Sequence, residues 1–128
     1  YAHHPTEISS VLSGVEKVYK NKEIVCVFQP HRISRVISLK KEFSKCFKKA
    51  DTVLLCPIYT ANEKLRLNFT YNSFAKLIIK NSNVRLIQVE DELQLQKFIK
   101  QNVFGEKIYI GMGAGSISNW MKNLKNIF

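Results

Sequence analysis

Glycine, proline and cysteine are scarce in this sequence of 128 residues, which contains 5 Gly, 3 Pro and 3 Cys. So little glycine and proline excludes a collagen-like chain and a low-complexity linker. The cysteines, Cys26, Cys46 and Cys56, are odd in number and share no metal-type spacing, which excludes a disulfide scaffold. Because they lie in apolar runs or on the inner face of an expected helix, we predict buried, reduced thiols, as in a cytoplasmic protein.

Long apolar runs are also missing, and none approaches the roughly 20 residues that a membrane-spanning helix needs. The first residues have neither a charged start nor an apolar stretch, so we expect no signal peptide and no membrane partner. The chain does not begin with Met, which fits a piece of a longer protein.

Acidic side chains are few, with 10 Asp and Glu against 20 Lys and Arg, so the net charge is +10. This balance raises nucleic acid, an anionic membrane surface or phosphorylated ligands as partners. The lysines are spread along the polar faces of expected helices and are not interleaved with exposed aromatic residues. A basic nucleic-acid-binding module is therefore an alternative interpretation and not the leading one.

The 45% of hydrophobic residues can build the core of one globular domain. Short β-branched runs predict four strands, at 24–29, 52–58, 84–89 and 107–112. Their apolar centres are typical of strands buried on both faces of a parallel sheet. Helical periodicity is found at 5–15, 36–50, 71–80, 91–102 and 117–124. With right-handed crossovers, this order predicts an α/β fold: an open, mostly parallel sheet with helices on both faces, in one three-layer domain.

Ligands of such sheets bind beyond the carboxyl ends of the strands, where residues 29–35 (QPHRISR) follow the first run. Arg32 and Arg35 are three residues apart at the start of a helix, so we expect them to be neighbours on one face. Cations at a helix N-terminus are unfavourable for stability, whereas guanidinium groups pair bidentately with carboxylate or phosphate. An anion site and a pair of solvated arginines are both compatible with this spacing.

The last run ends in residues 111–116 (GMGAGS), a glycine-rich turn that can bring backbone N–H groups close to an anion. It is no dinucleotide fingerprint, because Ser116 stands where the third glycine would be, and no G-K-[ST] motif occurs anywhere. Tight packing of strand against helix is the other explanation of this turn.

Histidines occur only at positions 3, 4 and 31, so a zinc site would need a distant Cys or carboxylate to complete it. In an extended segment, His3 and His4 point to opposite sides, which lets one face the ligand edge while the other packs. Glu63 lies in the long connection 59–70, of a length that is often functional, and is the one isolated acid near that edge.

Together, residues 1–7 (YAHHPTE), 29–35 and 113–117 (GAGSI) resemble the C-terminal domain of the Mur ligases, a family of cell-wall enzymes. Residues 58–63 match a further family loop weakly, and the resemblance covers essentially the whole chain. Within the family, the motifs resemble most the members that join L-alanine to UDP-N-acetylmuramate. It implies a Rossmann-like fold, the third domain of a three-domain ligase, with a leading strand before Tyr1.

The resemblance further implies ATP-dependent amide-bond synthesis in the bacterial cytoplasm, in which the amine of L-alanine attacks an acyl phosphate of the muramic acid. The domain would close over the other two and present the amino acid. By similarity, the residues around the amino acid and the reacting groups are Tyr1, His3, His31, Arg32 and Arg35, the two arginines holding the carboxylate. The residues of a substrate or interface loop are Glu63, Gly113, Gly115 and Ser116.

ATP and Mg²⁺ would be bound mainly by the two preceding domains, so this chain alone is expected to be inactive. Ile33 replaces the family's usual aromatic residue and Asn62 a usual glycine, which alters the local loop shape but not the charged residues. Since two arginines bind any α-carboxylate, a ligase of muropeptide recycling, or one for another first amino acid, stays open as an alternative.

Overall fold

A single parallel sheet forms the centre of the molecule in the computed structural model, which describes residues 3–60, 70–102 and 105–124. The strand order is β3-β2-β1-β4. The strands are β1 (Glu23–Phe28), β2 (Thr52–Leu55), β3 (Arg85–Gln88) and β4 (Lys107–Met112). The helices are α1 (Pro5–Val18), α2 (Ile33–Ser38), α3 (Lys40–Lys45), α4 (Tyr71–Ser82), α5 (Glu92–Gln101) and α6 (Ile117–Leu124). The predicted open parallel α/β fold is confirmed.

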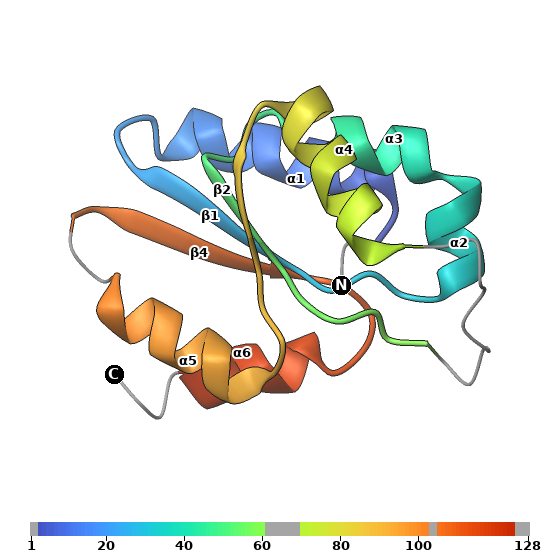
Figure 1. Cartoon of the computed structure of the whole chain (residues 1–128). Helices are drawn as coiled ribbons and strands as arrows, with labels where there is room; N and C mark the ends of the chain where they lie inside the picture. Colours follow the sequence, from blue (N-terminus) through green and yellow to red (C-terminus); the bar gives the residue numbers. More distant parts are fainter. Residues whose placement is uncertain (1–2, 61–69, 103–104, 125–128) are drawn as a thin grey trace.

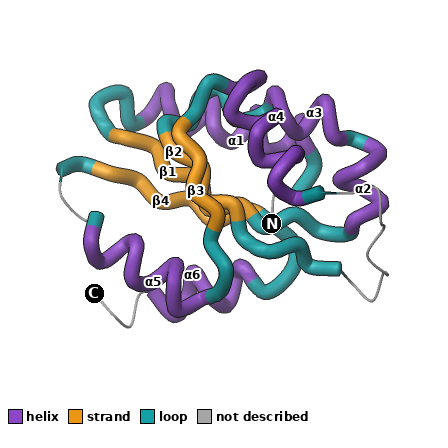
Figure 2. The backbone as a smooth tube through the Cα atoms, viewed as in Figure 1, coloured by secondary structure: helices purple, strands orange, loops and turns teal. Residues whose placement is uncertain are grey.

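Helices cover both faces of the sheet, with α1 to α4 on one face and α5 and α6 on the other (Figures 1 and 2). Alternate residues of β1 enter the two cores that result. Cys26 and Phe28 belong to the cluster beneath α1, α3 and α4, whereas Val25 and Val27 belong to the cluster beneath α5 and α6. The apolar run of the sequence is therefore explained by a central strand that is buried on both faces.

Both edge strands differ from the prediction of strands buried on both faces, since β4 is half-buried from Lys107 to Gly111 and β3 is more exposed still. Its end residues Arg85 and Gln88 are exposed, and Leu86 and Ile87 are only half-buried. Among the described residues it pairs with β2 alone, so it lies at the edge of the sheet. A strand at the edge of a sheet is buried less completely than a central one. The apolar run in the sequence does not predict whether a strand is central or at the edge.

The connection from β1 to β2 also differs, because the single helix expected around 36–50 is two short helices. They meet at Leu39, whose φ of −113° and ψ of 23° are not helical. Val36 and Phe43 are nonetheless both buried, as their spacing predicts. After α3, the hydroxyl of Ser82 accepts a hydrogen bond from the Phe47 N–H and donates one to a carbonyl of α3, which ties this connection to α4.

The helix starts agree with the sequence. Pro5 occupies the first turn of α1, and His4 Nδ1 accepts a hydrogen bond from the Thr6 N–H. The carboxylate of Asp91 caps α5 by accepting from the Gln94 N–H at 2.8 Å. Both contacts satisfy amide groups that a helix N-terminus leaves without intrahelical partners.

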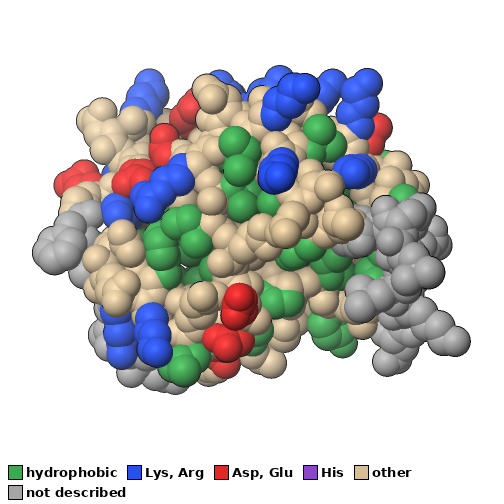
Figure 3. Space-filling model, viewed as in Figure 1, with side chains coloured by type: hydrophobic (Ala, Val, Ile, Leu, Met, Phe, Trp, Pro, Cys, Tyr) green, Lys and Arg blue, Asp and Glu red, His purple; other side chains and the backbone are tan. Residues whose placement is uncertain are grey.

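Positive charge is spread over the polar faces of the helices, as the sequence predicts, and lysines gather along the side formed by α3 and α4 (Figure 3). The described part of the chain contains no helix that is both long and apolar enough to cross a membrane.

We expect Gly14→Ala to stabilise the protein by about 0.5–1 kcal/mol, because glycine in a helix interior costs about that much relative to alanine. Gly14 lies inside α1, and a Cβ built there meets no atom within 4 Å. Urea unfolding followed by circular dichroism measures the change. A lower unfolding midpoint for Gly14→Ala would contradict the open surroundings of this position.

Candidate functional site

The segments that follow β1, β2 and β4 meet at the carboxyl edge of the sheet. Backbone hydrogen bonds continue past the strand ends, from the Cys56 N–H to the Phe28 carbonyl at 2.8 Å and from the Gln29 N–H to the Met112 carbonyl at 3.0 Å. The QPHR motif, the loop after β2 and the glycine turn are thereby brought side by side, as expected for a ligand edge.

Gln29 links all three segments with one buried side-chain amide. Its Nε2 donates to the Pro57 carbonyl at 3.2 Å and to the Ser116 hydroxyl at 3.0 Å. Its Oε1 accepts from the Ile117 N–H at 3.0 Å. The side chain is only 3% exposed, so these contacts compensate the cost of burying an amide. The sequence pattern shows Gln29 only as the first residue of the QPHR motif and does not predict this linking role.

Tyr59 is bound to the QPHR segment through its backbone. Its N–H donates to the Pro30 carbonyl, and its carbonyl accepts from the Arg32 N–H, both at 2.8 Å. These two bonds form an isolated parallel bridge between His31 and Tyr59. The Tyr59 ring stacks on the His31 imidazole, with centroids 5.3 Å apart and planes inclined by 9°.

The glycine turn fits closely against the same tyrosine. A Cβ at Gly115 would lie 2.5 Å from Cγ of Tyr59, so only glycine allows the backbone to approach the ring in this way. Gly113 has a φ of 146° and lies against the Gln29 carbonyl. Both glycines therefore have packing roles in the site, and Ser116 is held by Gln29.

Arg32 and Arg35 line one hollow on the side of α2, together with Ser34, Ser38 and Leu39. Arg32 precedes α2 with a φ of 68°, a region that residues with a Cβ seldom adopt and that is enriched at functional sites. Nη1 of Arg35 is buried and has no hydrogen-bond partner among the described residues. A buried cationic N–H without a partner is costly, which favours an anionic ligand at Arg35, whereas Arg32 is exposed.

The two N-terminal histidines separate as expected, with one difference. The ring of His3 lies edge-on to His31, with centroids 6.4 Å apart. His4 is exposed and caps α1, so it does not pack against the protein as predicted. Its Nδ1 is placed to accept from the first turn of the helix, which the sequence pattern did not show. Tyr1 and Glu63 lie outside the described residues.

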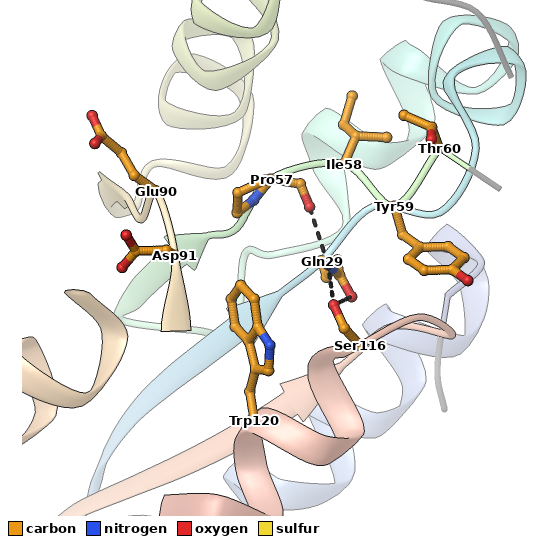
Figure 4. A pocket seen from close by; sticks show the side chains of 9 residues that line it. All are labelled: Gln29, Pro57, Ile58, Tyr59, Thr60, Glu90, Asp91, Ser116 and Trp120. Carbon is orange, nitrogen blue, oxygen red and sulfur yellow. Dashed lines mark hydrogen bonds between the residues drawn. The ribbon is translucent and has the colours of Figure 1, made fainter. Parts of the chain in front are cut away.

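Beside Tyr59, a hollow of about 380 Å³ opens at the sheet edge. Figure 4 shows Trp120 of α6 and the acidic pair Glu90 and Asp91 around it. The sequence pattern predicts helices at 91–102 and 117–124 but assigns neither Asp91 nor Trp120 to this site. No local pattern brings these two side chains together, since they lie in different strand–helix units.

The three cysteines are buried, as predicted. Burial raises the pKa of the Cys56 thiol to about 12 and also raises the pKa values of Cys26 and Cys46 well above the ordinary value for a thiol. Because the thiolate is the reactive form, these groups are poor nucleophiles at neutral pH.

Alkaline pH is therefore expected to destabilise the fold. The folded chain keeps its thiol protons where the unfolded chain loses them, so the free energy of unfolding falls as pH rises above about 8.5. Each buried thiol contributes up to about 1.4 kcal/mol per pH unit. Urea unfolding at pH 7.5 and 10 measures the loss. Cys56→Ala should reduce the slope by one thiol's share, and an unchanged slope would contradict this origin.

A comparison with known protein families adds to this geometry. The model of the family described as "Mur ligase, glutamate ligase domain" matches residues 1–115. This chain belongs to the Mur ligase family. The resemblance recognised in the QPHR motif and the glycine turn is thereby confirmed.

Individual members of the Mur ligase family cover nearly all of the chain. It is 65% identical over 127 residues to the UDP-N-acetylmuramate--L-alanine ligase of Pelagibacter ubique, which spans 99% of the chain and 27% of that protein. The ligase of the same name from Brachyspira hyodysenteriae is 41% identical over 119 residues, 91% of the chain and 25% of that protein. The chain thus spans about a quarter of the length of these curated relatives.

Solved structures of Mur ligases have the same architecture. The UDP-N-acetylmuramate-alanine ligase of Thermotoga maritima matches 99% of the chain and 25% of its own, with a TM-score of 0.72 and 26% identity. A murein peptide ligase from Psychrobacter arcticus covers 98% of this chain and 26% of its own, with a TM-score of 0.74 and 15% identity, a likeness of fold alone. The Rossmann-like fold expected from the resemblance is confirmed.

Proposed function

We propose that the chain is the amino-acid-binding, active-site-closing domain of an ATP-dependent UDP-N-acetylmuramate:L-alanine ligase of peptidoglycan precursor synthesis. The names of the relatives that match nearly the whole chain support this assignment. The observation that carries it is the Arg32 and Arg35 hollow, in which a buried guanidinium nitrogen has no partner among the described residues.

The domain's part in the reaction is to hold the amino acid. The guanidinium groups of Arg32 and Arg35 bind its carboxylate, which leaves the amine free to attack the activated carboxyl group of the muramic acid. His31 lies directly before Arg32 and has His3 beside it, and by the family resemblance both imidazoles border the place of the amino acid. By the family resemblance, Tyr1 completes this group.

We place the sites for ATP and Mg²⁺ mainly in the domains that precede this one in the ligase. No group of three His, Cys, Asp or Glu that could hold a metal ion occurs among residues 3–60, 70–102 and 105–124. The sequence also contains no G-K-[ST] motif that would hold phosphates. We therefore assign both cofactors to the part of the ligase outside this chain, together with the UDP-N-acetylmuramate pocket. The partners of the domain are then the other domains of the ligase, in the cytoplasm.

Phosphate release by the full-length ligase tests the proposal. The assay contains ATP, Mg²⁺ and UDP-N-acetylmuramate with L-alanine, glycine or L-serine in separate reactions, and this chain alone serves as the control. We expect release that requires the sugar nucleotide and is fastest with L-alanine, whereas the chain alone releases none. Release that prefers a peptide-bearing substrate would favour a recycling ligase, and no release with any amino acid would contradict the assignment.

A further inference from the structure

Tyr59 leaves 43% of its surface exposed and yet contacts two of the motifs at the ligand edge. Its ring lies parallel to the His31 imidazole, and the backbone of Gly115 approaches the same ring closely. Figure 4 shows the Tyr59 ring beside Gln29 and Ser116, with its hydroxyl pointing away from them. Among the described residues, the contacts of the Tyr59 side chain therefore involve its flat ring.

The stacked ring restricts His31 on one of its faces. His3 approaches the same imidazole edge-on, at a centroid distance of 6.4 Å. Aromatic rings in these two geometries attract each other and limit the rotamers of the ring between them. His31 is half-buried, and these two neighbouring rings contribute to the orientation of its imidazole.

The backbone of Tyr59 restricts Arg32 in turn. The Arg32 N–H donates to the Tyr59 carbonyl at 2.8 Å, directly at the residue whose φ is 68°. Such a backbone conformation persists only where surrounding contacts favour it. The two hydrogen bonds of the His31–Tyr59 bridge are contacts of this kind.

We propose that Tyr59 is a positioning residue for the amino-acid site: its ring orients His31 and its backbone holds the strained start of α2 at Arg32. The proposal rests on the proposed function. Tyr59 thereby influences the geometry of the QPHR motif from the segment that follows β2.

Tyr59→Leu in the full-length ligase tests this role, since it removes the ring and keeps the backbone. We expect KM for L-alanine to rise about tenfold, while KM for ATP and KM for UDP-N-acetylmuramate stay within twofold, and Tyr59→Phe should restore the original values. A merely structural defect would lower kcat through the active fraction and leave all three KM values unchanged. Tyr19→Leu is the matched control, because Tyr19 is also 43% exposed but precedes the opposite end of β1.

Nuclear magnetic resonance of ¹³C-labelled histidines in the same protein gives a second readout that does not depend on turnover. The stacked Tyr59 ring should shift the His31 ring protons upfield, an effect lost in Tyr59→Leu and retained in Tyr59→Phe; His31→Gln assigns the signal. If Tyr59→Leu does not fold, Tyr59→Met replaces it. The proposal would be overturned if the His31 signal were the same in Tyr59→Leu as in the unmodified protein. It would also be overturned if Tyr59→Phe and Tyr59→Leu raised KM for L-alanine equally. If the unmodified ligase were inactive but its His31 signal showed the expected upfield shift, only the proposed function would be contradicted.

Discussion

Replacing Arg35 by alanine in the full-length ligase is expected to lower kcat/KM for L-alanine by about 100-fold. Charge-assisted hydrogen bonds contribute about 1.5–3 kcal/mol each, and a guanidinium can donate two to a carboxylate. Nη1 of Arg35 is buried without a partner among the described residues, so a carboxylate supplies an acceptor for this donor. Steady-state kinetics with varied L-alanine measures the loss.

Two further variants define the origin of this effect. Arg35→Lys keeps the positive charge but loses the planar pair of donors, so its kcat/KM should fall between those of the original enzyme and Arg35→Ala. Arg85→Ala removes an exposed arginine at the amino end of β3, far along the sheet from the site, and should change nothing. A loss of less than threefold in Arg35→Ala would contradict the carboxylate role.

Stability should respond in the opposite direction. A buried N–H without a partner carries a desolvation cost, so Arg35→Ala should leave the free energy of unfolding unchanged or raise it. A residue that is costly for the fold but required for turnover is characteristic of a binding site.

The periodicity of the sequence predicted which side chains face the core. In β1 the alternation of Cys26 and Phe28 with Val25 and Val27 follows from the geometry of any strand, and the capping role of Asp91 follows from local backbone chemistry. The break at Leu39 was missed because the inward spacing of Val36 and Phe43 continues across it.

Long-range contacts of the site could not be found in this way. Gln29 and Ser116 are 87 positions apart, and their hydrogen bond exists because β1 and β4 are neighbours in the sheet. The stack of Tyr59 on His31 likewise depends on the register between the segments after β1 and β2. The arginine pair was found because both members lie within one motif.

The turn after β4 depends on glycine at position 113. We expect Gly113→Ala to lower the free energy of unfolding by about 2–4 kcal/mol. Its φ of 146° is unfavourable for alanine, and the new Cβ would lie 2.7 Å from the Gln29 carbonyl oxygen and 2.9 Å from Cγ2 of Ile117. Backbone strain and overpacking each cost about 1–3 kcal/mol. Urea unfolding of the original chain and the variant measures the difference.

Gly105→Ala separates the two costs. Gly105 also has a positive φ, of 81°, but a Cβ there would meet nothing within 4 Å, so only strain of about 1 kcal/mol is expected. Equal losses in both variants would mean that contact with Gln29 is unimportant. A larger loss at Gly113, with a raised KM for L-alanine in the full-length ligase, would show that the turn and the QPHR segment are positioned through one shared contact.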